Sequence, residues 1–438
     1  MKIQYTDEKI DNFGGLIYFK HFLQRISFET IARKVFSSRP SQAKYSFGDI
    51  FSSHTYTALA GGSFTEDIDH LKEMLPSGVY SNICSTTTFQ KMVQRLSYAG
   101  DNFSITLDSG VAHEFCMHKP LNTLLTRLAS KTLQSGDSGN IQFLDHDHSK
   151  IYTNKKDAKQ CYKGAGYYVS CFSTGNIPVY LSSQSGNSTP KSELPRVLEY
   201  GLKHLQSYDL TDQYVFRADG ACYSYEALNT ITDYCQDFLV RSKKCERRVN
   251  MLEESGTRLE DSSGNVYHVY EYYDSIKSSG SNTSHEIPVR RILYKPVQKD
   301  PSDLFSSHRY HEVITSLDAK DYSPVEIIQM YNQRGRSERL FDELKNDFNL
   351  AQPPSSDLQY NSAYFILCAI SCVLVKQFKQ WIHKKTHGLI PQSIRLKQLR
   401  FRLISIPGKH VEHAREVAYK LYTQSTCLIK HLTNIQLC

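Results

Sequence analysis

The chain has 438 residues, of which 40% are hydrophobic and 22% are charged, a composition that excludes a disordered chain and a small disulfide-bonded scaffold. Its formal net charge of +7 is modest, and the total alone does not identify a polyanionic partner. The charge is unevenly divided: residues 376–438 carry 12 basic and two acidic residues, a net charge of +10, whereas the other 375 residues have a net charge of −3.

The cysteines and the apolar segments predict the cellular compartment of the protein. Eleven cysteines without a C-x-x-C pair argue against a disulfide framework and a zinc ribbon, so we expect reduced thiols. The first nine residues lack the apolar segment of a secretory signal, which predicts a cytoplasmic protein. The most apolar run, residues 363–375, is shorter than the ~20 residues of a membrane span, so it predicts a buried helix and no membrane partner.

The first part of the chain, residues 1–135, is predicted to be mostly helical. Apolar residues recur at helical spacing in residues 17–23 and 89–96, and Ser85 is a candidate N-cap for the second helix.

A Gly/Ser-rich stretch at residues 135–140 separates this region from a series of predicted strands. Runs rich in aromatic and β-branched residues predict an antiparallel meander formed by residues 141–148, 167–172 and 178–181. A helical period over residues 194–205 then precedes a strand at 214–219. This order of strands and helices predicts a mixed α/β sheet.

The second half of the chain contains a candidate insertion. Strand-like runs flank a Ser/Gly/Asn-rich linker near residues 278–284, and Ser323 followed by Pro324 predicts the start of a helix. We divide the chain into a helical region (1–135), the first part of a mixed α/β core (136–235), an inserted β element (236–305), the second part of the core (306–350) and a basic helical C-terminal region (351–438).

The string Asp145-His-Asp-His places two carboxylates on one face of a strand. Alternation puts Asp145 and Asp147 together, and His146 and His148 on the opposite face. Neighbouring carboxylates repel each other unless a cation lies between them, and Mg²⁺ prefers oxygen ligands of this kind. A solvated strand face is the simpler alternative, and a zinc site at the histidines is a minority one.

Asp219 is a second candidate acid. It ends the strand at residues 214–219 and is followed by Gly220, so its carboxylate lies at a strand end, where sheets commonly present ligands. An Asp-Gly pair after a strand is also the usual sequence of a plain turn.

A third candidate lies in a helix predicted after residue 323. At about 100° per residue, Tyr331, Arg334, Glu338 and Lys345 fall on one narrow stripe. A solvated helix face with intrahelical ion pairs would look similar. However, a carboxylate flanked by two cations and a phenol also suits a metal ligand beside a phosphate backbone.

These residues carry a resemblance to a known family. The spacing Tyr331-x2-Arg334-x3-Glu338-x6-Lys345 resembles the Y-x2-R-x3-E-x6-K signature of DDE transposases from bacterial insertion sequences. Other segments resemble the insertion-sequence-1380 family and occur in the same order along the chain: Leu144-Asp-His-Asp-His-Ser, Gly186-Asn-Ser-Thr-Pro-Lys, Arg217-Ala-Asp-Gly, Tyr331-Asn-Gln-Arg-Gly and Leu399-Arg-Phe-Arg-Leu.

The resemblance implies an RNase H-like catalytic core, formed by residues 136–235 and 306–350, whose acids hold Mg²⁺, with Mn²⁺ able to substitute. It also implies that residues 1–135 form a DNA-binding or assembly region. Asp219 and Glu338 match the second and third acids, and Asp147 is favoured over Asp145 as the first because Ser149 occupies the place of the family's Thr. Related families stack a flipped base on an inserted tryptophan. The one tryptophan here is Trp381, so an inserted tyrosine would have to replace it, or the step is absent.

The implied function is cleavage and strand transfer at the ends of an insertion sequence in a bacterial cytoplasm. The implied partners are double-stranded DNA, namely the terminal inverted repeats and the target, bound by a homodimer or a higher oligomer. The segment 86–96 is a candidate for recognising the DNA sequence, but an ordinary packing helix gives the same pattern. The alternatives are a transposase-derived DNA-binding protein and a nuclease without strand transfer. The residues expected to contact phosphates are Tyr331, Arg334, Lys345, Arg395, Lys397, Arg400, Arg402 and Lys409.

Overall fold

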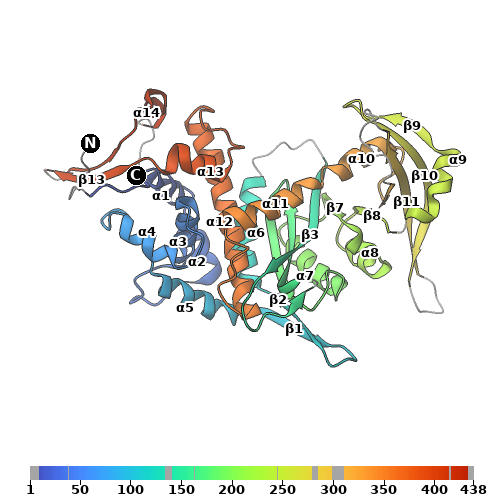
Figure 1. The fold of residues 1–438 in the computed structure, drawn as a ribbon, viewed down its shortest axis with the longest axis horizontal. Coiled ribbons are helices and arrows are strands. Elements are labelled where there is room, and N and C mark those ends of the chain that lie inside the picture. Colours follow the sequence, from blue (N-terminus) through green and yellow to red (C-terminus); the bar gives the residue numbers. More distant parts are fainter. Residues whose placement is uncertain are drawn as a thin grey trace.

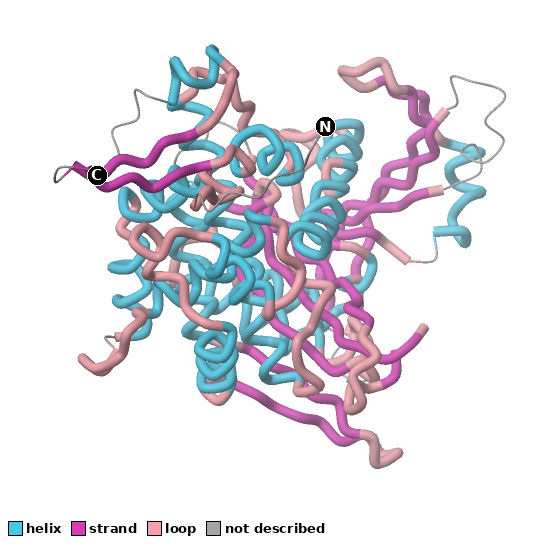
Figure 2. Tube along the Cα trace, turned by 60° about the vertical axis from the view of Figure 1, so that its left-hand side comes forward, coloured by secondary structure: helices cyan, strands magenta, loops and turns pink. Residues whose placement is uncertain are grey.

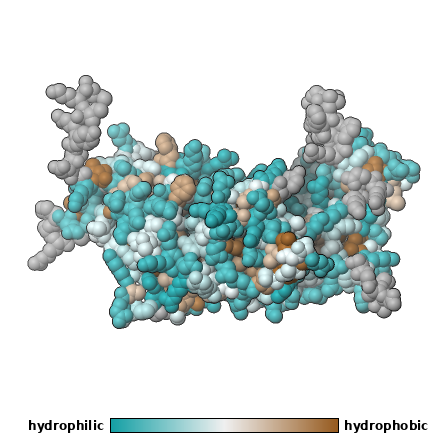
Figure 3. All heavy atoms as spheres, turned by 60° about the horizontal axis from the view of Figure 1, so that its bottom comes forward, coloured by the Kyte–Doolittle hydropathy of each residue, from teal (hydrophilic) through white to brown (hydrophobic). Residues whose placement is uncertain are grey.

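The computed structural model describes residues 9–37, 39–133, 141–161, 163–243, 245–278, 285–297, 310–413 and 416–432. Figure 1 shows an elongated molecule with N- and C-terminal helices together at one end, a sheet in the middle and a β element at the other end. Figure 2 shows the strands continuing from the central part into that element. The visible surface in Figure 3 is mainly hydrophilic, with scattered hydrophobic residues.

The N-terminal region is mainly helical, as predicted, and contains a hairpin between its last two helices. Its elements are α1 (Leu16–Arg25), α2 (Phe28–Phe36), α3 (Phe47–Ala60), α4 (Asp67–Met74), α5 (Thr86–Ser97), β1 (Asp101–Thr106), β2 (Ala112–Met117) and α6 (Lys119–Leu133). The predicted cap is confirmed, because the Ser85 side chain accepts a hydrogen bond from the Thr88 amide at 3.2 Å. The hairpin joins the main sheet through β2, which pairs with β6.

The central sheet has the mixed topology expected of an RNase H-like core. The core elements are β3 (Gln142–Tyr152), β4 (Gln160–Cys161), β5 (Gly164–Thr174), β6 (Ile177–Ser185), α7 (Leu194–Gln206), β7 (Tyr214–Ala218), α8 (Tyr225–Thr232) and β8 (Asp237–Arg241). The strand order is β6-β5-β3-β7-β8, and β4 pairs only with β5. The predicted meander is confirmed, since β3, β5 and β6 are antiparallel, whereas β3, β7 and β8 are parallel.

The inserted β element extends the same sheet. It contains α9 (Val249–Ser255), β9 (Thr257–Glu260), β10 (Val266–Lys277) and β11 (Glu286–Pro296), and β11 pairs with β12 (His311–Thr315). β12 in turn pairs with β8, which itself pairs with the core strand β7. The segment 236–305 therefore includes a core strand at its start, because the apolar run in β8 is needed to complete the parallel part of the sheet.

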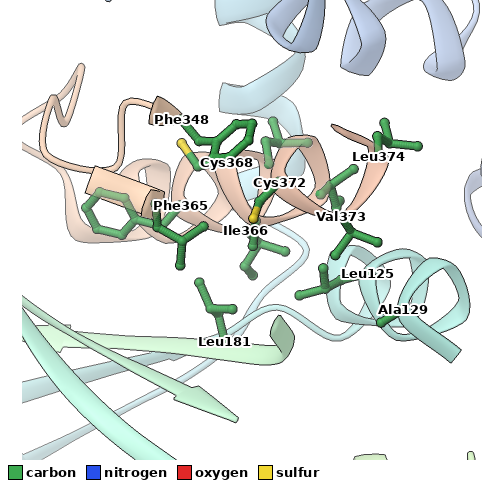
Figure 4. Close-up of a cluster of buried hydrophobic side chains, with 14 of the residues drawn as sticks. Leu125, Ala129, Leu181, Phe348, Phe365, Ile366, Cys368, Cys372, Val373 and Leu374 are labelled. Carbon is green, nitrogen blue, oxygen red and sulfur yellow. The ribbon is translucent and has the colours of Figure 1, made fainter. Parts of the chain in front are cut away.

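Helix α12 (Leu358–Lys385) joins the two halves of the molecule and confirms the predicted buried helix. It is long and apolar enough to cross a membrane, but 94% of its apolar window is buried inside the protein, as in the core helix of a globular domain. Figure 4 shows its side chains Ile366 and Val373 lying near Leu125 and Leu181, which come from α6 and β6. One apolar core therefore connects the helical region to the sheet.

The C-terminal region is less helical than predicted. It contains α13 (Leu396–Leu399), a π-helical turn (Arg400–Ile404), and α14 (Thr426–Leu432), but also a hairpin of β13 (Gly408–His413) and β14 (Glu416–Leu421). The prediction of an all-helical end was wrong because short alternating segments can pair with each other locally. A bridge between Asp11 and Gly408 ties the hairpin to the N-terminal region.

Candidate functional site

The parallel pairing of β3 and β7 brings two candidate acids to neighbouring positions. In this register Asp145 lies opposite Arg217, and His146 lies opposite Ala218. Asp147 and Asp219 are the next residues along the two strands, at the point where β7 ends. The predicted alternation is confirmed, because Leu144 and His146 are buried on one side of β3, whereas Asp145 and Asp147 meet arginines on the other.

Asp145 is engaged in a buried ion pair. Arg217 donates from Nε to one carboxylate oxygen at 2.5 Å and from Nη2 to the other at 2.9 Å, and both side chains are less than 5% exposed. The same guanidinium lies over the Phe143 ring and donates to the main-chain carbonyl of Met330. Both oxygens of Asp145 therefore have partners inside the protein, and its side chain is 4% exposed, compared with 15% for Asp147. Asp147 also has partners, since one of its oxygens accepts a hydrogen bond from the His148 amide at 2.9 Å, but its greater exposure makes it the candidate for the first acid.

Asp147 faces an arginine from the helical segment after residue 323. Its carboxylate lies 3.2 Å from Arg334 Nη1, and each of the two side chains is 15% exposed. Burial raises the pKa of Asp147, and the nearby charge of Asp219 raises it further, whereas Arg334 lowers it. Asp219 also caps a short 3₁₀ turn, since its carboxylate accepts a hydrogen bond from the Ala221 amide at 2.8 Å.

Tyr331 completes the group around the two acids. It is buried at the C-terminal end of α10 (Pro324–Asn332), where burial raises the pKa of its hydroxyl, so the phenol remains protonated at neutral pH. Burial alone would lower the pKa of Arg334, but Asp147, Tyr331 and Asp219 outweigh it and raise that pKa. The cationic Arg334 and the hydrogen-donating Tyr331 thus lie next to the carboxylates of Asp147 and Asp219.

The other half of the predicted stripe lies on a separate helix. The helical segment is interrupted at Gln333 and Arg334, so Glu338 and Lys345 belong to α11 (Gly335–Asp347), which contacts β3. The prediction of one continuous helix was wrong, although α10 and α11 follow one another nearly in line in Figure 1. Glu338 is exposed, and Lys345 is half-buried, with burial lowering the pKa of its ammonium group.

The described residues offer only part of a metal site. Among them, no group of three His, Cys, Asp or Glu side chains is arranged to hold a metal ion. Asp147 and Asp219 supply hard oxygen donors that suit a divalent cation such as Mg²⁺, but Glu338 does not lie with them. His146 shares a hydrogen bond with Ser170 Oγ at 2.8 Å and packs against Phe172, so it serves the core rather than the zinc site considered above.

The basic C-terminal residues occupy different environments. Arg400 donates to the carbonyls of Leu59 at 3.0 Å and Ala58 at 2.7 Å, and so caps the end of α3. Arg402 donates to a main-chain carbonyl at 2.9 Å but remains exposed, Arg395 and Lys397 are exposed, and Lys409 is half-buried in β13. The predicted phosphate-contacting set therefore contains one arginine that is committed to the fold.

Two lysines that sequence reasoning did not select interact with each other, and one of them, Lys243, also interacts with Asp219. Lys243 follows β8 and interacts electrostatically with Asp219 and with Lys191. Lys191 ends the segment Gly186-Asn-Ser-Thr-Pro-Lys, so that motif was a signal for it, but no pattern marked Lys243. Trp381 packs against Phe22 and Phe378, in the core rather than the inserted element.

Comparison with known proteins identifies the family. A family model described as transposase DDE domain group 1 matches residues 1–436. A comparison with curated proteins gave no match. The matched range includes both acids of the candidate site, the insertion and the basic C-terminal region, and the large mixed sheet is consistent with the RNase H-like core of such transposases. The chain belongs to the group 1 family of transposase DDE domains.

Proposed function

We propose that this transposase cleaves DNA at the ends of its own insertion sequence and joins the freed ends to a target. The observation that carries the proposal is the convergence of Asp147 and Asp219 on adjacent parallel strands, with Arg334 and Tyr331 beside them. We further place the chain with the insertion-sequence-1380 type, on the Tyr-Arg-Glu-Lys spacing and the other segments quoted above.

The two aspartates and Glu338 are the proposed catalytic acids. A divalent cation, Mg²⁺ or Mn²⁺, would supply charge neutralisation and activation of water or of a 3′-hydroxyl when bound. Asp147 and Asp219 would hold it, because each presents a carboxylate at the same edge of the sheet. Glu338 is the third acid by its spacing from Tyr331, and it lies exposed on α11, where DNA can reach it.

The cationic and phenolic groups would hold the DNA backbone. Arg334 is the partner of Asp147 in the DNA-free chain, and its planar guanidinium is also suited to paired hydrogen bonds with a phosphate. Tyr331 keeps its hydroxyl proton at neutral pH and can donate it to a phosphate oxygen. Lys345, on the same helix as Glu338, would add a further contact. Such groups position the reacting strand without forming a covalent intermediate.

Weaker, sequence-independent contacts are proposed for the exposed basic residues of the C-terminal region. Arg395, Lys397 and Arg402 are exposed there, and we include the half-buried Lys409 of β13. Their contacts would make binding dependent on salt. Recognition of both element ends, by a homodimer or a higher oligomer in the cytoplasm, completes the proposal.

The test compares Glu338→Gln with Asp342→Asn, which replaces an exposed acid one turn later on the same helix. Both proteins are incubated with Mg²⁺ and labelled DNA that carries an element end. We expect Glu338→Gln to abolish cleavage while retaining DNA binding, and Asp342→Asn to retain both. Normal cleavage by Glu338→Gln would contradict the assignment.

A transposase-derived DNA-binding protein without catalysis is the second candidate. It is favoured by the position of Glu338 apart from the two aspartates and by the ion pair that occupies Asp147. DNA binding without any cleavage by the wild-type chain, in Mg²⁺ or Mn²⁺, would support it. Cut ends that never become joined or hairpin products would instead indicate a nuclease without strand transfer.

A further inference from the structure

Lys191 and Lys243 form a basic pair beside Asp219 that the proposed catalytic residues do not include. Lys191 lies between β6 and α7, and Lys243 follows β8, so the fold brings together two segments about 50 residues apart in the sequence. Lys191 is exposed, whereas Lys243 is partly buried.

The side chain of Lys243 is fixed over the loop that follows Asp219. A Cβ atom added to Gly220 would lie 3.5 Å from Lys243 Cγ and 3.7 Å from its Cε, so the lysine chain passes directly over this glycine. Its Nζ donates to the main-chain carbonyl of Tyr223 at 3.3 Å and lies 5.8 Å from the centre of the Tyr223 ring. The ammonium group is therefore held at the loop rather than extended into solvent.

The inserted β element also contacts this loop. Arg291 of β11 donates from Nη2 to the Tyr223 hydroxyl at 2.9 Å. Arg291 is itself held by Glu312, at 3.0 Å, and by Asp274, at 2.8 Å. The position of Lys243 is thus set by contacts from both the core and the insertion.

The two lysines carry like charges close together. Burial lowers the pKa of Lys243, and the charge of Lys191 lowers it further. Among the residues that the structure describes, neither ammonium group forms an ion pair with a carboxylate within 4.0 Å. An anion between the two nitrogens would remove this repulsion, and a phosphate oxygen next to Asp219 has the required charge and size.

We propose that Lys191 and Lys243 bind one phosphate of the DNA strand that enters the site beside Asp219. The proposal rests on the proposed function, because it takes the ligand to be the DNA on which the transposase acts. The pair would hold the strand on the Asp219 side of the site, in addition to the contacts assigned to Arg334 and Tyr331. Ordinary surface lysines would not need the fixed position that Lys243 has.

The first experiment measures the affinity of the full chain for a duplex carrying its element end, in EDTA so that no cleavage occurs. The variants are Lys191→Gln, Lys243→Gln and the double variant, and Lys203→Gln, an exposed lysine on α7, is the matched control. We expect each single variant to make the slope of log affinity against log salt shallower by about 1, while the control leaves it unchanged. Equal unfolding midpoints establish that all variants are folded.

The second experiment identifies the contact itself. Duplexes in which one phosphate at a time is replaced by a neutral methylphosphonate are bound to the wild type and to the double variant. We expect one replaced phosphate to weaken binding by the wild type while leaving the double variant unaffected, because the charge partner is already lost. A merely structural role of the lysines would not produce this position-specific effect.

The outcomes separate this proposal from the proposed function. If the variants match Lys203→Gln in salt slope, or if every methylphosphonate affects wild type and double variant equally, the phosphate site is wrong while cleavage by the wild type still supports the transposase activity. If the wild type shows neither end binding nor cleavage, the proposed function and the phosphate site are both overturned.

Discussion

Removing one partner of the ion pair between Asp145 and Arg217 should destabilise the fold far more than breaking an exposed ion pair would. Both side chains are less than 5% exposed, and two donors of the guanidinium meet the two carboxylate oxygens. We therefore consider Asp145→Leu, Arg217→Met and the double variant. Each single change leaves one charge buried without its partner, whereas the double change leaves apolar side chains of comparable volume.

The expected magnitudes differ strongly between these variants. Breaking a buried pair from one side costs about 3–5 kcal/mol of the free energy of unfolding, whereas an exposed pair contributes about 0–1 kcal/mol. Replacing both partners by apolar groups is commonly close to neutral. Here the double variant also loses the hydrogen bond to the Met330 carbonyl, which is worth about 1 kcal/mol. We therefore expect its free energy of unfolding to lie within roughly 2 kcal/mol of the wild-type value.

Urea unfolding of the full chain, followed by circular dichroism, measures these differences. The double-mutant cycle should give a coupling energy of about 2 kcal/mol or more between the two sites. Additive single effects, or single effects below about 1 kcal/mol, would refute the reasoning. The double variant also tests the site: DNA cleavage that survives the loss of Asp145 would show that this residue is not the first acid.

Three other results are expected. Because burial raises the pKa of Asp147, the stability linked to its protonation is present at low pH and is lost as pH rises through that pKa. At pH 8, Asp147→Asn should therefore lower the free energy of unfolding by less than about 1 kcal/mol while abolishing cleavage. A larger loss of stability in urea unfolding would contradict this. Arg400→Ala should destabilise the chain by about 2 kcal/mol, because the cap of α3 is lost, and should leave the slope of log DNA affinity against log salt unchanged. Lys397→Ala should leave stability unchanged and make that slope shallower by about 1. Burial lowers the pKa of His54 to about 4, so the stability linked to its neutral form is present above about pH 6.5 and is lost as pH falls through about 4. His54→Gln should therefore reduce the loss of stability between pH 7.5 and 4.5 by roughly 3 kcal/mol. An unchanged pH profile of stability would show that protonation of His54 does not contribute to acid destabilisation.

Strand-level features could be predicted because they depend on local sequence. The period-2 pattern from residue 141 placed Asp145 and Asp147 on one face, and Ser85 and Ser323 were found as helix caps from their neighbours alone. The turn-rich spacing between the first strands also predicted the meander. In each case the controlling interactions lie within a few residues of one another.

Features that depend on distant partners could not be predicted in the same way. Nothing near Asp145 indicates that Arg217 would neutralise it, since the pair spans 72 residues of sequence. The sequence gives the charge of Arg400, which predicts a phosphate contact, but it does not show that the carbonyls at the end of α3 bind this arginine. The interruption of the helix at Gln333 and Arg334 is not predicted either, because the sequence pattern was assumed to follow one helical period throughout.

The two acid–arginine pairs of the site follow from one register. Asp145 pairs with Arg217 across β3 and β7, and two residues further along each strand the same face presents Asp147 and Asp219. Because side chains alternate, a shift of one residue would turn all four away from this face, so the buried pair specifies the register that brings the outer acids together. Arg217 also donates to the carbonyl of Met330, the residue before Tyr331, and so ties α10 to that register. The buried ion pair thus positions the strands and the helix that form the candidate site, which gives Asp145 a structural role two residues before the proposed catalytic acid Asp147.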